Sequence, residues 1–372
     1  MKDGSEARPS MAGAASIAYR RWRDDPEAWA DALGVSGEAT ALYAASEVID
    51  LHIDSFIWTR IFGYDLHRKH GLGLFGRRFY SQVDFPRALE AGLTGAIWVI
   101  TTNPFKPARW RRDAFFENLA HLKSILASGA GDIALVRNRA EYEQARASGR
   151  HGAFLGIQGG NCLDYDLSDI ERIPPGDILR CTVVHLTTSS LGQTSTPLPR
   201  RLTRWDGLTD RGREFIQRLN AAKIFVDLAH ISRRAFFEVA AVHDPSQPLM
   251  VTHTGVAGVY EHWRNVTDEQ LRVVANTGGC VGVMLQDDFL TDREATAATV
   301  VDHLAHICDV VGDDVPCLGT DYDGAITPPA DLATPWALPR LVQEMLDRRW
   351  SPERIQKILG LNFLRVVESL RG

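Results

Sequence analysis

Several features that would assign the chain to a large class of proteins are absent from its 372 residues. Basic residues are not in excess: the formal net charge is −6, so the surface offers no positive field to attract nucleic acid. No apolar stretch approaches the ~20 residues that span a membrane, and the N-terminus lacks the continuous apolar segment of a secretory signal. We therefore expect a cytoplasmic protein that binds neither nucleic acid nor membranes.

Cysteine is also scarce, and its pattern excludes a disulfide framework. The five cysteines are an odd number and include no C-x-x-C pair. Most of them lie in apolar surroundings, so we expect buried, reduced thiols. A hydrophobic content of 45% and a charged content of 24% are those of an ordinary globular protein that buries a sizeable core.

What the sequence does contain is a series of eight short apolar runs separated by segments of helix length. The runs are rich in Val, Ile, Leu and Phe, as expected for strands buried on both faces. We predict strands at 48–53, 94–100, 153–157, 181–185, 224–228, 249–252, 280–285 and 315–319. Alternation of strand and helix on this scale predicts a (β/α)₈ TIM barrel. Residues 1–45 are expected to form a partly helical N-terminal extension, and residues 46–372 a single barrel domain.

Residues of the metal-binding type follow most of these runs. In a parallel barrel the carboxyl ends of the strands meet at one mouth, where active sites lie. Scattered core histidines have no reason to fall at strand ends this often, so the pattern favours a metal-dependent hydrolase. The residues concerned are His52, Asp54, Gln158, His185, His230, His253 and Asp321.

The pair His52 and Asp54 gives the sharpest local signal. Alternation along a strand points both side chains to the same face, so an imidazole nitrogen and a carboxylate oxygen can meet one cation. His230 and His253 follow neighbouring strands and either bind a second zinc ion or complete the first site. The alternative for these two is a pair of buried histidines that bind backbone carbonyls.

His185 and Asp321 are the candidates for catalysis. His185 is either a further ligand or the donor of a hydrogen bond to a developing oxyanion, and we favour the donor role because the other strands already supply enough ligands. Asp321 is the expected base, because a carboxylate there can accept a proton from metal-bound water and pass it to a leaving nitrogen.

A long irregular region between Thr187 and Thr209 follows the fourth predicted strand. A structureless stretch of this length inside a compact domain is usually functional. Because it lies on the expected active face, we interpret it as a substrate lid. The alternative is a surface loop without a role.

Taken in order, these motifs resemble those of the membrane dipeptidase (renal dipeptidase) family of the amidohydrolase superfamily. The resemblance extends from about Val48 to Leu370 and includes the blocks DLHID, GIQGGNCL, TVVHLTTSSLG, LTDRGREFIQRLNAAKIFVDLAHIS, VTHTGV, RNVTDEQLRVVANTGGCVGV and GTDYDGA. It implies a (β/α)₈ barrel with two zinc ions at its mouth, and it suggests a homodimer.

The resemblance also implies a role for each site residue. His52, Asp54 and a bridging carboxylate would bind the first zinc ion, and His230 and His253 the second. His185 would polarise the scissile carbonyl and Asp321 would carry protons. Arg264, in RNVTD, occupies the place of the arginine that binds the substrate carboxylate. A guanidinium fork suits that task, because it can hold a carboxylate with two hydrogen bonds.

Gln158 departs from the family pattern, because it stands where the family has the bridging glutamate. A neutral amide offers a carbonyl oxygen but no charge, so it bridges two dications far less favourably. The site then holds one metal ion, two ions bridged mainly by hydroxide, or none under ordinary conditions. We favour one tightly bound zinc ion, since His52, Asp54, His230 and His253 are all retained.

The leading hypothesis is therefore a zinc-dependent hydrolase of dipeptides or similar small amides that bear a free carboxylate. A second hypothesis keeps the barrel and the metal but changes the substrate to a modified peptide, a lactam or a natural-product intermediate. A third is a catalytically silent barrel that binds small molecules or a partner protein. Retention of Asp321, Arg264 and four candidate ligands argues against a silent barrel.

Overall fold

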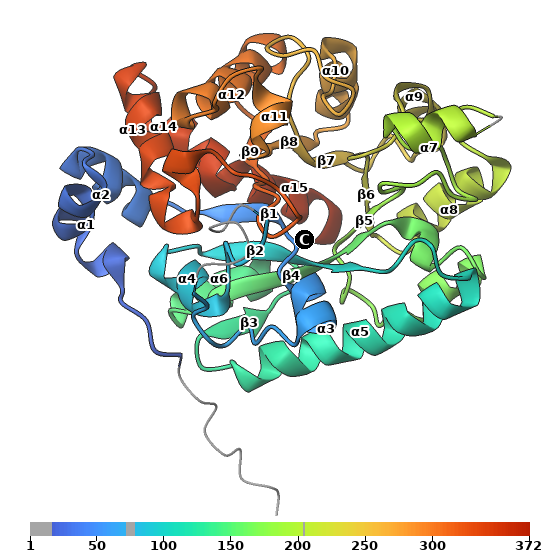
Figure 1. Cartoon of the computed structure of the whole chain (residues 1–372), viewed down its shortest axis with the longest axis horizontal. Helices are drawn as coiled ribbons and strands as arrows, with labels where there is room; N and C mark the ends of the chain where they lie inside the picture. Colours follow the sequence, from blue (N-terminus) through green and yellow to red (C-terminus); the bar gives the residue numbers. More distant parts are fainter. Residues whose placement is uncertain (1–16, 72–78, 204) are drawn as a thin grey trace, which may run out of the picture.

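Eight parallel strands close into a barrel, as the sequence predicts (Figure 1). The structure is a computed structural model that describes residues 17–71, 79–203 and 205–372. Neighbouring strands pair in the order β2-β1-β9-β8-β7-β6-β5-β4, and β2 pairs with β4 to close the ring. The barrel strands are β1 (Ile49–Ile53), β2 (Gly95–Thr101), β4 (His151–Gln158), β5 (Arg180–Thr182), β6 (Phe225–Asp227), β7 (Met250–Thr254), β8 (Cys280–Val283) and β9 (Pro316–Leu318).

A ninth strand, β3 (Ile133–Leu135), was not predicted. It pairs with the first three residues of β4, while β5 pairs only with Gly156–Gln158 on the same edge. A run of three residues is too short to stand out as a strand in the sequence. The predicted strand at 181–185 is also too long. β5 ends at Thr182, so His185 lies in the loop after the strand rather than within it.

The side chains inside the barrel follow the two-residue period of the strands. On β2, Ile97 and Val99 face the lumen, whereas Trp98 and Ile100 pack against the surrounding helices. Thr101 follows Val99 by two residues, so it also faces the lumen, at the mouth of the barrel. On β4, Gln158 faces the lumen for the same reason, because it lies four residues after the lumen residue Phe154. The strand period thus directs Gln158 into the centre of the mouth.

The opposite end of the lumen is sealed by the last helix, α15 (Asn362–Arg371). Its apolar face contacts the lower ring of lumen side chains, which makes a core separate from the one under the outer helices. The site therefore has one open end. This lower core consists largely of Ile49, Leu51, Ile97, Val99, Phe154, Phe225, Met250, Cys280, Cys317, Phe363, Leu364, Val366 and Val367.

The other helices surround the barrel or cover its ends. They are α1 (Pro26–Leu33), α2 (Gly37–Ala45), α3 (Phe56–Phe62), α4 (Phe85–Glu90), α5 (Ala108–Ser128), α6 (Arg139–Ala147), α7 (Pro197–Leu202), α8 (Asp210–Ala221), α9 (Arg233–Val242), α10 (Asp268–Asn276), α11 (Asp287–Leu290), α12 (Ala297–Val311), α13 (Pro339–Asp347) and α14 (Pro352–Gln356). Thr267 and Gln270 form the capping box expected from their spacing. None of the helices in the described part of the chain combines the length and apolarity that crossing a membrane requires.

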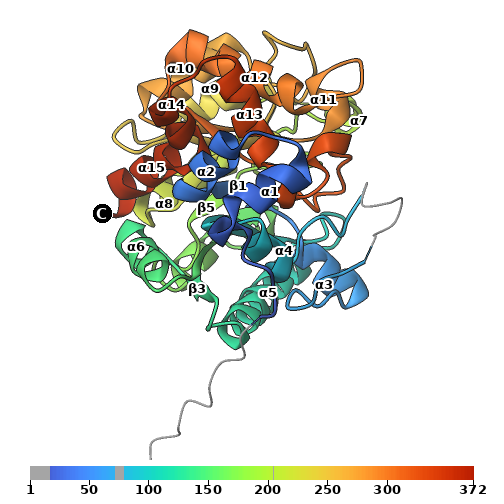
Figure 2. The ribbon, with the colours of Figure 1, turned by 90° about the vertical axis from the view of Figure 1, so that its left-hand side faces the viewer.

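The predicted N-terminal extension contains α1 and α2, which lie beside α13 on the outside of the barrel (Figure 2). Trp29 is fully buried there, and its Nε1 donates to the carbonyl oxygen of Trp336 at 3.1 Å. The hydroxyl of Tyr43 donates to the carbonyl of Ala91 at 2.9 Å. Residues 1–16 of the extension lie outside the described residues, and the domain boundary at residue 45 stays a prediction.

The region 187–209 is not structureless. It contains α7 and two isolated bridges, Gly192 with Leu208 and Thr194 with Ile231. The Thr194 hydroxyl donates to the carbonyl of His185 at 2.6 Å, and the Ser195 amide donates to the carbonyl of His230 at 2.8 Å. The region thus fixes the backbone of two site histidines, while its role as a lid stays a prediction. All five cysteines are buried and free, as expected.

Replacement of Trp29 tests whether the N-terminal helices fold as one unit with the barrel. We expect Trp29→Ala to lower the free energy of unfolding by about 3–5 kcal/mol, because it leaves a large cavity in a shared core. Trp110→Ala is the matched control: that side chain is 46% exposed, so its loss should cost about 0.5 kcal/mol or less. Urea unfolding followed by circular dichroism measures both, and equal costs would show that α1 is not part of the cooperative unit.

Candidate active site

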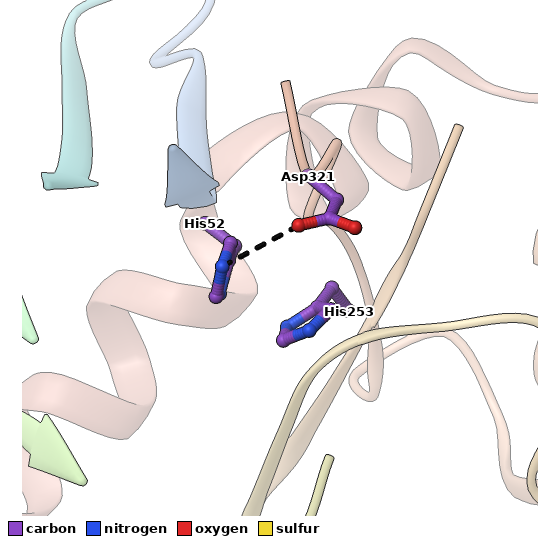
Figure 3. A group of neighbouring side chains, drawn as sticks. All are labelled: His52, His253 and Asp321. Atoms are coloured by element: carbon purple, nitrogen blue, oxygen red, sulfur yellow. Dashed lines mark ion pairs between the residues drawn. The ribbon is translucent and has the colours of Figure 1, made fainter. Parts of the chain in front are cut away.

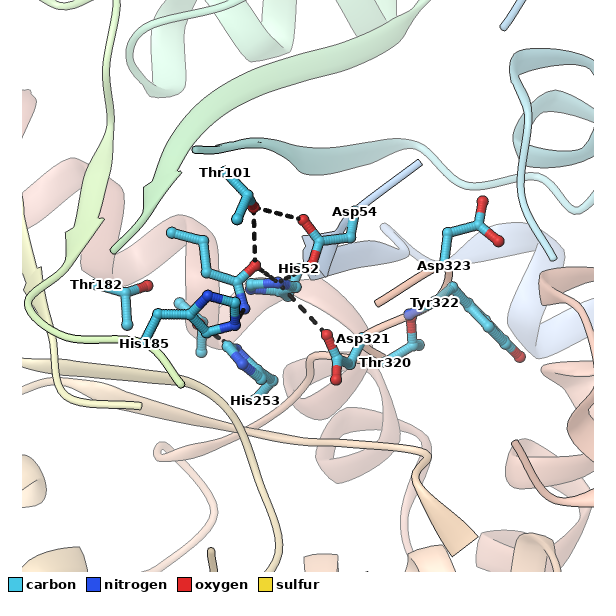
Figure 4. Close-up of polar contacts among 12 residues, drawn as sticks. His52, Asp54, Thr101, Thr182, His185, His253, Thr320, Asp321, Tyr322 and Asp323 are labelled. Carbon is cyan, nitrogen blue, oxygen red and sulfur yellow. Dashed lines mark hydrogen bonds and ion pairs between the residues drawn. The ribbon is translucent and has the colours of Figure 1, made fainter. Parts of the chain in front are cut away.

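The residues predicted for the site converge at the mouth of the barrel. Figure 4 shows five of them together, namely His52, Asp54, His185, His253 and Asp321. They surround a cavity of about 310 Å³. His52 and His253 are fully buried at its base and come from β1 and β7. The predicted residues that line the cavity itself are Asp54, Gln158, His185, His230, Arg264 and Asp321.

The densest part of the site is formed by His52, His253 and Asp321 (Figure 3). One potential ligand atom from each lies within 4.8 Å of the other two, and all three residues are buried. His52 Nε2 is 3.5 Å from Asp321 Oδ1 and also 3.5 Å from Asp54 Oδ2. Asp321, which the sequence suggested as a base, thus lies among the candidate ligands.

Gln158 occupies the centre of the site, with His52 on one side and His185 and His230 on the other. Its Oε1 is 2.8 Å from His52 Nε2, and its Nε2 is 3.0 Å from His185 Nε2 and 3.4 Å from His230 Nε2. In this orientation Oε1 also lies 2.7 Å from Asp54 Oδ2. Two oxygen acceptors at that separation repel each other unless a cation or a proton lies between them.

The reverse orientation of the same amide removes this repulsion, but it brings Gln158 Nε2 to 2.8 Å from His52 Nε2. Gln158 Nε2 then donates to both carboxylate oxygens of Asp54, at 2.7 and 3.1 Å, and Oε1 accepts from His185 Nε2 at 3.0 Å. One orientation therefore gathers oxygen atoms around a cation, and the other replaces the cation with an N–H donor. The donor set of imidazoles and carboxylates is the one that zinc prefers, so these residues fit a metal ion.

A buried ion pair lies directly beneath the site. Arg180, on β5, and Asp227, on β6, are both fully buried, and Arg180 Nη1 is 3.1 Å from Asp227 Oδ2. Asp227 also accepts hydrogen bonds from the hydroxyls of Thr182 at 2.6 Å and Thr252 at 2.7 Å. Burial acts to raise the pKa of Asp227, but the Arg180 charge and these hydrogen bonds outweigh it, so the pKa lies below its ordinary value.

This ion pair sets the tautomer of His253. The Thr252 hydroxyl donates its hydrogen bond to Asp227. It can therefore only accept from His253 Nδ1, which lies 2.9 Å away. With its proton on Nδ1, His253 presents the lone pair of Nε2 to the site, as a metal ligand must. His230 Nε2 is 2.8 Å from that nitrogen and donates to it.

The same pair acts on His52 in the opposite sense. Arg180 Nη2 lies 2.7 Å from His52 Nδ1, and a guanidinium can only donate, so Nδ1 accepts. The proton of the neutral ring is then on Nε2, where it faces Gln158 Oε1. Burial and the adjacent Arg180 charge both lower the pKa of His52, which keeps the ring neutral.

Two site residues have left-handed backbone conformations. The φ angles of His230 and Asp321 are +66° and +63°, in a region that residues with a Cβ enter at a cost of about 1–3 kcal/mol. The turn after Asp321 is fixed by Asp323, which accepts hydrogen bonds from the Ser55 hydroxyl and the amides of Gln82 and Val83. Such strained positions, held by surrounding contacts, are typical of functional sites.

Arg264 and Asp321 are the charged groups that face the cavity from the side of β7 and β9. Arg264 is buried, its Nη2 donates to the His253 carbonyl at 2.7 Å, and its Nε has no partner among the described residues. Burial lowers its pKa to about 10, so it stays charged at neutral pH. Burial, reinforced by Asp54, raises the pKa of Asp321 well above its usual range, as suits a group that takes up protons.

The sequence did not reveal four polar residues that support the site. Thr101 donates to Asp54 Oδ1 at 3.1 Å, and Arg180, Asp227 and Thr252 form the network beneath it. The available signal was a charged residue inside an apolar run, as in LRCTVV and IFVDLA. A buried charge in a strand needs a partner, but the sequence does not say which one.

Comparison with known proteins assigns the family. The model of the membrane dipeptidase family (peptidase family M19) matches residues 37–371. Together with the barrel and its donor set, this match defines a metal-binding hydrolase of dipeptide or amide bonds. The chain belongs to the membrane dipeptidase family.

Individual relatives agree with this assignment. Dipeptidase aclJ of Aspergillus oryzae is 27% identical over 339 residues, which are 86% of this chain and 76% of that protein. An uncharacterized protein in the pqqA 5′ region of Klebsiella pneumoniae is 28% identical over 264 residues, 69% of this chain and 96% of that protein. A metallopeptidase from Rhodobacter sphaeroides, solved with a phosphinate mimic of L-Ala-D-Ala, shares the fold with a TM-score of 0.75 at 24% identity, over 87% of this chain and 99% of that one.

Loss of the charge on Asp227 should destabilise the whole protein. We expect Asp227→Asn to lower the free energy of unfolding by about 3–5 kcal/mol, because the buried Arg180 guanidinium loses its counter-charge. Asp292→Asn is the control: that carboxylate is 75% exposed, and its loss should cost about 0.5 kcal/mol or less. A cost for Asp227→Asn no larger than that of the control, in chemical denaturation at neutral pH, would contradict the role assigned to the pair.

Proposed function

We propose that the protein is a zinc-dependent hydrolase of dipeptides or similar small amides that bear a free carboxylate. The observation that carries the proposal is the convergence of imidazoles, carboxylates and one unpaired guanidinium on a single cavity. Membership of the dipeptidase family supports the same chemistry. His52, Asp54, His230 and His253 would hold the metal ion, with the Gln158 oxygen completing the donor set. Bound zinc would supply a Lewis acid and an acidified water molecule.

The remaining residues then have separate tasks. Asp321 accepts a proton at its carboxylate and returns it to the leaving amine, a task that suits its raised pKa. His185 is neutral, because burial lowers its pKa to about 4, and it donates a hydrogen bond to the developing oxyanion. That role requires a proton on the His185 nitrogen that faces the substrate.

Arg264 is placed to bind the free carboxylate of the substrate. Its guanidinium is buried next to the cavity and has no carboxylate within ion-pair distance among the described residues. A buried cation without a counter-ion is costly, so an anionic substrate group is the natural partner. Two hydrogen bonds to a planar carboxylate would also fix the position of the scissile bond.

We further propose that one zinc ion is bound tightly per chain. Gln158 contributes no charge, and two dications at the usual separation need a negative bridge to offset their repulsion. The hydrogen bond that Arg180 donates to His52 places the proton of the neutral ring on Nε2, so His52 binds zinc only when this nitrogen gives up its proton.

Hydrolysis is tested with dipeptides and with their C-terminal amides, in both L,L and L,D forms. We expect turnover of the free dipeptides, and Asp321→Asn should lower kcat by about 10²–10⁴-fold because general acid–base help is lost. Asp288→Asn removes an exposed carboxylate near the mouth and should have no effect. Full activity of Asp321→Asn would refute the mechanism. Equal rates for free and amidated substrates would show that Arg264 does not bind the substrate carboxylate.

Metal content tests the role of Gln158. We expect elemental analysis of the purified protein to give about one zinc per chain, and Gln158→Glu to raise the number towards two because it restores a bridging charge. Gln144→Glu, which changes an exposed glutamine on α6, is the control for added charge. Two tightly bound zinc ions in the unaltered protein, or an unchanged number in Gln158→Glu, would contradict this account of the bridge.

A further inference from the structure

A second cavity of about 290 Å³ adjoins the mouth of the barrel. It lies between the region that carries α7, the start of α9 and the loop that joins β7 to α10. His230, Trp263 and Arg264 line both this cavity and the one above the candidate metal ligands. A substrate held by Arg264 can therefore extend into either cavity.

The second cavity carries an excess of positive charge. Arginines from three separate elements line it, namely Arg200 of α7, Arg233 at the start of α9, and Arg264. The one carboxylate in its lining is that of Glu261, which is 78% exposed and 3.8 Å from Arg233 Nη2. An ion pair this long and this exposed has a weak interaction energy, so the positive charge of Arg233 is largely uncompensated.

Arg200 is also available for a ligand. Its guanidinium has no carboxylate within ion-pair distance among the described residues, although α7 places it in the cavity wall. Three cations converging on one concave surface with a single carboxylate raise the local concentration of anions. The cavity is thus suited to an anionic group beyond the one that Arg264 binds.

The first cavity has the opposite character. Apart from the candidate ligands, its wall is mainly apolar, with Ile57, Trp58, Leu186, Met284, Phe289 and Ile326. Arg264 lies at the boundary between the two cavities, so the two residues of a bound dipeptide lie on either side of it. The residue whose carboxylate binds Arg264 is the one next to the arginine-rich cavity, and the other residue lies against the apolar wall.

We propose that the preferred substrates are dipeptides with an apolar N-terminal residue and an acidic C-terminal residue. The C-terminal carboxylate binds Arg264, and the acidic side chain enters the second cavity and binds Arg233 and Arg200. The inference rests on the proposed function for the place of the scissile bond. It adds the substrate class, which the candidate catalytic residues do not determine.

The test compares Leu-Glu with Leu-Gln, which differ only in the charge of the C-terminal side chain. We expect kcat/KM to be about 10-fold higher for Leu-Glu, with a preference that shrinks as salt is raised from low concentration to about 0.5 M. Arg233→Gln and Arg200→Gln should each reduce the ratio, and together abolish it. Arg234→Gln is the control, because Arg234 is 63% exposed, pairs with Glu238 and does not line the cavity.

The outcomes separate the substrate class from the reaction. Turnover of both dipeptides with a ratio near one, or an equal loss of preference in Arg234→Gln, would overturn the acidic preference and leave the hydrolase intact. If neither dipeptide is hydrolysed and the L,L and L,D panel described above is also inert, the proposed function fails. Calorimetric titration of the same two dipeptides then tests whether the second cavity binds the acidic side chain. Tighter binding of Leu-Glu that is lost in the double arginine variant supports this proposal, and equal binding of the two dipeptides refutes it.

Discussion

The buried ion pair between Arg180 and Asp227 is the interaction on which the site depends. It holds two neighbouring strands together at their carboxyl ends, and its hydrogen bonds decide where the protons of His52 and His253 lie. Removing both charges from water is costly, and well-packed apolar residues of similar volume are often at least as stabilising as a buried ion pair. Here the pair fixes the positions of the protons on the imidazoles above it.

The sequence was sufficient to predict the barrel and the convergence of the site, because both follow from periodicity. Once eight apolar runs are recognised as parallel strands, Asp54, His230 and Asp321 must meet at one end. The strand β3 was missed because three residues carry too weak a pattern. His185 was placed on a strand that in fact ends at Thr182, since strand boundaries depend on pairing with a neighbour.

Other parts of the site could not be read from the sequence because they depend on contacts between distant segments. Arg180 and Asp227 are 47 residues apart in the chain, and no local pattern pairs them. The arginine-rich cavity likewise joins α7, α9 and the loop before α10. Gln158 was recognised as an exception, but the two ways in which its amide can face Asp54 and His185 appear only when all three side chains are placed.

The helix that seals the lower end of the barrel has a consequence for the order of assembly. α15 follows all the strands in the chain, yet its side chains complete the lumen core formed by strands as early as β1. The barrel therefore lacks its floor until α15 docks, and the apolar lumen stays open to water until then. We expect docking of α15 to be a late step of folding, because every strand that it contacts is made before it.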